Sequence, residues 1–70
     1  MRCTVQLKND KYIEITNFKM VKYPKQTQGY NEITEENFDK IRLSNATTYQ
    51  FIGNETAIIK GEDVLYLYFE

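Results

Sequence analysis

Hydrophobic and polar residues alternate over residues 2–8, which places the apolar positions on one side of an extended chain. The alternation returns over residues 11–16 after Asn9 and Asp10, which tolerate the left-handed backbone of a tight turn. The apolar positions of the two runs are Cys3, Val5, Leu7, Ile13 and Ile15. Matching apolar faces on both sides of a two-residue turn predict a β-hairpin.

Residues 17–23 either extend the second strand after a bend or form a third short strand, so 2–23 make an N-terminal hairpin region. Pro24 ends this region, because proline cannot donate a hydrogen bond to a strand ladder. Residues 24–33 are mostly polar and are predicted to form the longest loop.

One short helix is predicted over residues 34–42. The Thr34 hydroxyl suits an N-cap, and acidic residues follow it at the positive end of the helix dipole. Ile33 and Phe38 have the spacing of a hydrophobic staple. Asn37 stands where a complete capping box has Glu or Gln, so the signal supports about two turns of helix.

Short strands separated by glycine-containing turns predict a three-strand antiparallel meander over residues 47–69. Its strands are 47–52, 56–60 and 64–69. The order β-β-(β)-α-β-β-β predicts an α+β fold that is mostly antiparallel β, either a twisted sheet or a small open barrel. Seventy residues provide one core, so residues 1–70 form one domain.

The closing strand is apolar or aromatic on both faces. Leu65, Leu67 and Phe69 share one face, and Val64, Tyr66 and Tyr68 share the other. A two-turn helix is too short to cover a sheet face alone, so we expect another protein surface to cover the tyrosines. The expected interface is Tyr49, Tyr66 and Tyr68, with Phe51 as a core neighbour. In the alternative, the tyrosines belong to the core.

Charge is divided unequally along the chain, although the formal net charge is only −1. Residues 1–27 carry six basic and two acidic side chains, whereas residues 28–70 carry three basic and eight acidic ones. A basic half with interleaved aromatics suggests an alternative function in nucleic-acid binding. Its contacts would be Lys8, Lys11, Lys19, Lys22 and Tyr23. Lysines on edge strands that discourage sheet aggregation are the simpler explanation.

Acidic residues gather around the predicted helix start. They are Glu32, Glu35, Glu36 and Asp39. They are predicted to supply rim contacts, together with the polar loop, and to steer the protein to a basic partner. A helix N-terminus also favours carboxylates for its own stability, which is the alternative explanation.

Catalytic chemistry has few candidate residues. The chain has no histidine, its three glycines form no phosphate-binding loop, and Cys3 is its only cysteine. We therefore expect no catalytic residues, no metal and no cofactor, and place Cys3 in the core. No apolar stretch has the length of a membrane span and no secretory signal is apparent, so a cytoplasmic location is expected.

The expected function is a non-enzymatic protein–protein interaction module that forms a homodimer or binds another protein. An excess of residues with AT-rich codons, such as Lys, Asn, Ile and Tyr, suggests an AT-rich genome, such as that of a low-GC bacterium, its phages or its mobile elements. The acidic half suggests a phage or mobile-element product that acts on a host protein. The alternatives are a nucleic-acid-binding protein and a structural homodimer of unknown function.

Overall fold

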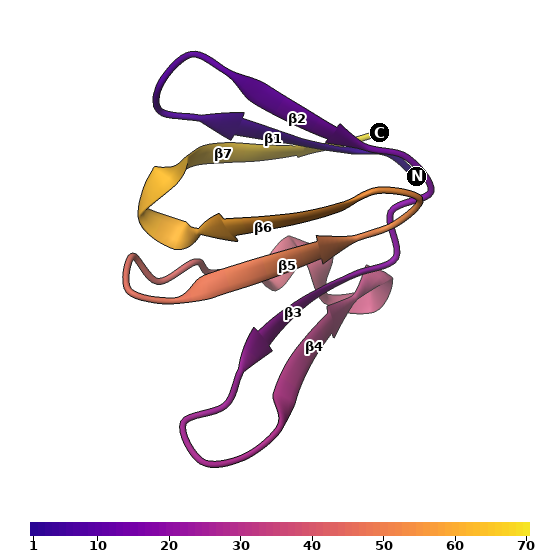
Figure 1. The fold of residues 1–70 in the computed structure, drawn as a ribbon. Coiled ribbons are helices and arrows are strands. Elements are labelled where there is room, and N and C mark those ends of the chain that lie inside the picture. The colour runs from indigo at the N-terminus through magenta and orange to yellow at the C-terminus, as the bar shows by residue number, and fades with distance from the viewer.

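Seven strands and two 3₁₀ helices form two antiparallel sheets in the computed structural model, which describes all residues 1–70 (Figure 1). In chain order the elements are β1 (Cys3–Leu7), β2 (Tyr12–Ile15), β3 (Met20–Pro24), β4 (Tyr30–Thr34), η1 (Glu35–Lys40), β5 (Thr48–Ile52), β6 (Thr56–Lys60), η2 (Gly61–Asp63) and β7 (Val64–Phe69). The three-stranded sheet has the order β2-β1-β7, and the four-stranded sheet has the order β4-β3-β5-β6. No helix is long and apolar enough to cross a membrane.

The β1–β2 hairpin confirms the N-terminal prediction. Cys3 lies opposite Ile15, so the apolar positions of both strands share one face. The turn differs, because it holds three residues rather than two. Leu7 N–H donates to the Lys11 carbonyl at 2.8 Å, and Asp10 supplies the left-handed backbone with φ of 70°. A third turn residue in that conformation fits the right-handed twist of the strands.

The long polar loop predicted over 24–33 is wrong. Tyr30–Thr34 forms β4, which pairs along the whole length of β3, and only residues 25–29 form the turn. Gly29 closes this turn with φ of 86° and accepts a hydrogen bond from Lys25 N–H at 3.0 Å. β3 pairs with β5 on one side, and its other side provides backbone partners for β4. Polar side chains are compatible with the exposed positions of β4.

The predicted α-helix over 34–42 is also wrong, and with it the α+β class. Residues Glu35–Lys40 form a 3₁₀ helix, Thr34 makes no side-chain cap hydrogen bond, and Ile41 is already extended. The structure has no α-helix, and half of the chain lies in strands. A run this short with an incomplete capping box lacks the length for a stable α-helix, so packing of Phe38 decides its conformation.

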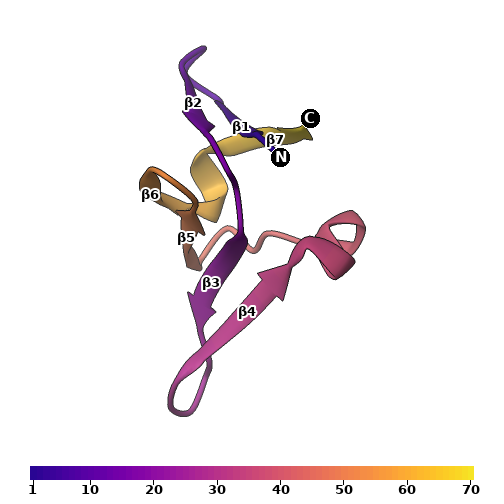
Figure 2. The same cartoon turned by 90° about the vertical axis from the view of Figure 1, so that its right-hand side faces the viewer.

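The predicted C-terminal three-strand meander is wrong for its last strand, and only the β5–β6 hairpin is as expected. After β6, the turn η2 directs the chain to β1, and β7 pairs antiparallel with β1 rather than with β6. Cys3 lies opposite Phe69, and Val5 lies opposite Leu67. The two ends of the chain are therefore adjacent (Figures 1 and 2).

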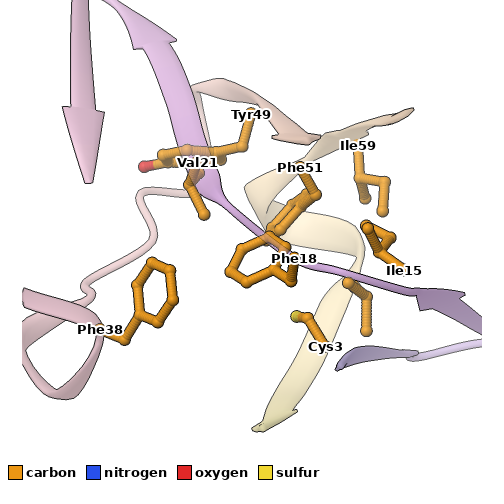
Figure 3. Close-up of a cluster of buried hydrophobic side chains, with 9 residues drawn as sticks. Cys3, Ile15, Phe18, Val21, Phe38, Tyr49, Phe51 and Ile59 are labelled. Atoms are coloured by element: carbon orange, nitrogen blue, oxygen red, sulfur yellow. The ribbon is translucent and has the colours of Figure 1, made fainter. Parts of the chain in front are cut away.

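Phe18 lies at the centre of a core of nine buried residues (Figure 3). Its ring centroid is 4.9 Å from that of Phe38 and 5.7 Å from that of Phe69. Phe38 and Phe69 are stacked at 5.1 Å, so η1 closes one end of the core through a single aromatic side chain. Cys3 and Phe51 are fully buried, as predicted. The buried residues are Cys3, Val5, Ile15, Phe18, Val21, Phe38, Tyr49, Phe51 and Ile59.

Candidate protein-binding surface

Three tyrosines lie on the outer face of the three-stranded sheet, which we call the tyrosine face. Tyr12 and Tyr66 flank Gln6 in the strand register, and Tyr68 lies beside Thr4. The opposite face carries the core residues of β1, β2 and β7, because side chains alternate along a strand. The exposed fractions are 61% for Tyr12, 53% for Tyr66 and 54% for Tyr68. The structure thus leaves Tyr66 and Tyr68 outside the core.

Tyr49 does not belong to this face, so its predicted place in the interface is wrong. It lies on β5 in the other sheet and is only 2% exposed. Its hydroxyl oxygen accepts a hydrogen bond from Ser44 N–H at 2.7 Å, and its ring packs against that of Tyr23 at 5.3 Å. The alternation of Tyr49 and Phe51 with polar Thr48 and Gln50 was a sequence signal for this inward orientation.

Tyr12 was not among the residues predicted for the interface, because that prediction rests on the aromatic residues of the C-terminal strands. Its position was readable from the hairpin: it alternates with Ile13, whose side chain packs against the core. Once β7 joins the opposite edge of β1, Tyr12 becomes part of the same face as Tyr66.

An irregularity in the β1–β7 pairing exposes a leucine. The register shifts between Gln6 and Leu7, since Gln6 lies opposite Tyr66 but Leu7 lies opposite Val64. Leu65 is the extra residue of this β-bulge, and it is 59% exposed although Leu67 packs against the core. A bulge changes the direction of side chains on the strand that contains it. Leu65 and Tyr66 therefore form a continuous apolar surface at one end of β7.

A groove of about 410 Å³ runs along β7 on the side away from β1. Eight of its ten lining residues are hydrophobic. One wall is the strand itself, from Val64 to Leu67 and Phe69; the other includes Phe38, Ile41 and Leu43, which belong to η1 and the segment after it. No strand lies between β7 and η1 (Figure 2). The sequence pattern does not predict this groove, because the groove depends on which edge of β7 stays unpaired.

The predicted rim contacts are separated in the structure. Glu35, Glu36 and Asp39 are exposed on η1, beside the groove, whereas Glu32 lies on β4 of the other sheet. The turn 25–29 is at the tip of the β3–β4 hairpin, which extends away from the three-stranded sheet (Figures 1 and 2). The turn therefore cannot form a rim around the tyrosine face in this arrangement.

The lysines of the alternative nucleic-acid site also lie apart. Lys8 and Lys11 flank the β1–β2 turn, while Lys19 and Lys22 precede or belong to β3, and Figures 1 and 2 place these segments at different ends of the molecule. The Lys22 ammonium lies 5.5 Å from the centroid of the Tyr30 ring. Tyr23 is half-buried against Tyr49. The five residues do not form one continuous surface.

Titratable groups with shifted pKa values have structural explanations. Burial raises the pKa of the Cys3 thiol to about 11, which keeps it protonated near neutral pH. Hydrogen bonds from Thr16 lower the pKa of Glu55. The carboxylate of Glu70 raises the pKa of Arg2, with which it forms an ion pair at 2.7 Å. The structure contains no group of three or more His, Cys, Asp or Glu residues arranged to hold a metal ion.

Comparison with known proteins identifies no relative. No protein-family model matches the chain, and no curated protein and no solved structure matches it either.

Proposed function

We propose that this protein is a non-enzymatic protein-binding module that binds through the tyrosine face of its three-stranded sheet. One observation carries the proposal: Tyr12, Tyr66 and Tyr68 are each more than half exposed on one face. Exposed aromatic side chains gathered on one face of a sheet are typical of protein interaction sites. Tyrosine is enriched at such sites, because its large rigid ring provides contact area and its hydroxyl provides a hydrogen bond.

The sheet beneath these rings is a rigid support. β1 is hydrogen-bonded to a strand on each side, and the Arg2–Glu70 ion pair lies at the end of the β1–β7 ladder. Thr4 and Gln6 lie between the tyrosines and have shorter side chains, so the rings border a shallow polar strip. A partner binding here gains aromatic contact without a large ordering cost, since the platform is already formed.

The experiment compares the triple variant Tyr12→Thr, Tyr66→Thr, Tyr68→Thr with the control Tyr30→Thr. Threonine keeps a high β-propensity. Tyr30 is 55% exposed on β4 of the other sheet, so its replacement removes one comparably exposed aromatic ring elsewhere on the molecule. Each protein is immobilised, captured proteins are identified by mass spectrometry, and far-ultraviolet circular dichroism checks the fold. We expect a protein captured by the wild type and the control to be absent with the triple variant.

Light scattering on an eluting peak then separates the two kinds of partner. A monomeric wild type that captures a different protein supports a foreign partner. A dimer that dissociates in the triple variant supports self-association through the same face. Equal capture by the triple variant and the wild type would rule out the tyrosine face, and an unfolded triple variant would show that the tyrosines are structural.

A further inference from the structure

We propose that the groove beside β7 binds one extended segment of a partner protein, which adds to β7 as a fourth strand of the three-stranded sheet. The bound segment alternates apolar side chains and carries Lys or Arg at its ends. This inference rests on the proposed function, because it specifies the part of the partner that the module recognises.

One edge of β7 carries unpaired backbone groups. Arg2 and Glu70 exchange two hydrogen bonds of 2.9 Å, and in an antiparallel ladder every second residue pair is bonded in this way. Tyr68 and Tyr66 therefore direct their N–H and C=O groups to β1. The corresponding groups of Leu67 and Phe69 point away from β1, toward the groove. Unpaired edge groups of this kind are the template used in recognition by strand addition.

The side chains around this edge are mostly apolar. A strand added beside β7 directs alternate side chains to the two faces of the sheet. Those on the core side would contact Phe38, Ile41 and Leu43, and the others would extend the tyrosine face beside Tyr66 and Tyr68. The apolar wall therefore selects apolar residues at every second position. The free edge of β4 has no such groove beside it, since neither hollow of the structure is lined by β4.

The surroundings of the groove are acidic. The segments 35–45 and 60–70, which provide its walls, carry six acidic and three basic side chains. The acidic residues are Glu35, Glu36, Asp39, Glu62, Asp63 and Glu70. Lys60 pairs with Glu62 at 3.2 Å and Arg2 pairs with Glu70 at 2.7 Å, which leaves Glu35, Glu36, Asp39 and Asp63 without an ion-pair partner. A second copy of β7 would bring the same acidic flanks and meet like charge, whereas a segment with Lys or Arg ends is complementary.

The test begins with selection from a random ten-residue peptide library displayed on phage, using the whole protein as bait. We expect the enriched sequences to alternate apolar residues and to carry basic ends. The most enriched peptide is then synthesised, and amide hydrogen exchange is measured by NMR with and without it. Binding should slow exchange of the Leu67 and Phe69 amides at least about tenfold, the effect of one hydrogen bond. The Tyr66 and Tyr68 amides are already bonded to β1 and serve as internal references.

A pair of proline variants tests the same edge. Leu67→Pro removes the N–H that the segment needs, and we expect it to weaken peptide binding about tenfold. Glu32→Pro is the matched control, because the β3–β4 ladder directs its N–H away from β3 on an edge outside the groove. If Leu67→Pro fails to fold, the amide exchange measurement on the wild type still tests whether the peptide binds at this edge.

Several results would overturn the inference. These are selection without enrichment, enriched peptides that lack the alternating and basic pattern, or protection at residues other than Leu67 and Phe69. Protection of these two amides in the protein alone, rising with its concentration, would assign the groove to a second copy. The proposed function is tested independently of the groove, and it is wrong if the triple tyrosine variant captures the same partner as the wild type.

Discussion

The carboxylate of Glu55 accepts hydrogen bonds from both the backbone N–H and the hydroxyl of Thr16, at 2.7 and 3.0 Å. The two residues are 39 positions apart. Thr16 directly follows β2, the edge strand of one sheet, and Glu55 belongs to the β5–β6 turn of the other. Asn54 N–H donates to the Thr16 carbonyl at 2.8 Å beside them. These bonds hold the two sheets together at one end, where the backbone passes from β2 to β3.

The Glu55 carboxylate should make stability depend on pH. Its pKa is lowered from the ordinary 4.5 by the hydrogen bonds from Thr16, so the unfolded chain binds more protons than the folded chain in this range. The stabilisation is present above pH 4.5 and is lost as pH falls through the lowered pKa. We expect Glu55→Gln to unfold at a lower temperature than the wild type at pH 7, and the difference to shrink by pH 3. A constant difference between pH 3 and pH 7 would contradict this role.

Gly61 should not tolerate a larger side chain. It is buried, and an added Cβ would overlap the Ser44 carbonyl and lie 3.1 Å from the Tyr49 ring. The first neighbour is backbone and the second is a buried ring, so neither moves aside easily. We therefore expect Gly61→Ala to reduce the free energy of unfolding by about 1–3 kcal/mol. Chemical denaturation measures the change. The control is Gly29→Asn, since Gly29 has φ of 86° with open space around it and Asn tolerates that backbone. Equal stability of Gly61→Ala and wild type would be inconsistent with this packing.

The hydroxyl of Tyr49 should stabilise the fold rather than contribute to binding. Tyr49→Phe leaves the part-buried Ser44 N–H without its acceptor, which costs about 1 kcal/mol. In a domain of this size that corresponds to a fall of about 4–8 °C in Tm. Tyr12→Phe, on the exposed tyrosine face, is the comparison and should change Tm much less. The assignment of Tyr49 to the core fails if Tyr49→Phe keeps full stability but loses a partner.

Cys3 should react slowly in the folded protein. Its thiol is fully buried and its pKa is raised to about 11 from 9.0, and the thiolate is the reactive form. The pKa difference alone predicts that the thiol reacts with a disulfide reagent at pH 8 about 100-fold more slowly than in the denatured chain. The release of a coloured thiol from a disulfide reagent, with and without guanidinium, measures both rates. Similar rates would show that β1 opens readily or that Cys3 is accessible.

Some of the fold is determined by the sequence alone. Strict alternation at Cys3, Val5 and Ile15 indicates both strands of the first hairpin and the side each residue faces, because a one-residue slip would expose every apolar side chain. The β5–β6 hairpin is indicated in the same way. The sequence also shows that the chain has no histidine, no glycine-rich loop and no cysteine pair. The expectation of a non-enzymatic role rests on these features of the sequence.

Tertiary structure decided the remainder, including the candidate site. Two strands of similar composition can pair equally well locally, so only the assembled core could select β1 rather than β6 as the partner of β7. That choice placed Tyr12 and Tyr66 on either side of Gln6 on one sheet face, and it left one edge of β7 unpaired above an apolar groove. A strand that is apolar on both faces contains no local signal of which face is buried. The exposure of Tyr66 and Tyr68 follows from what packs against Leu67 and Phe69, which are contacts between residues far apart in the chain.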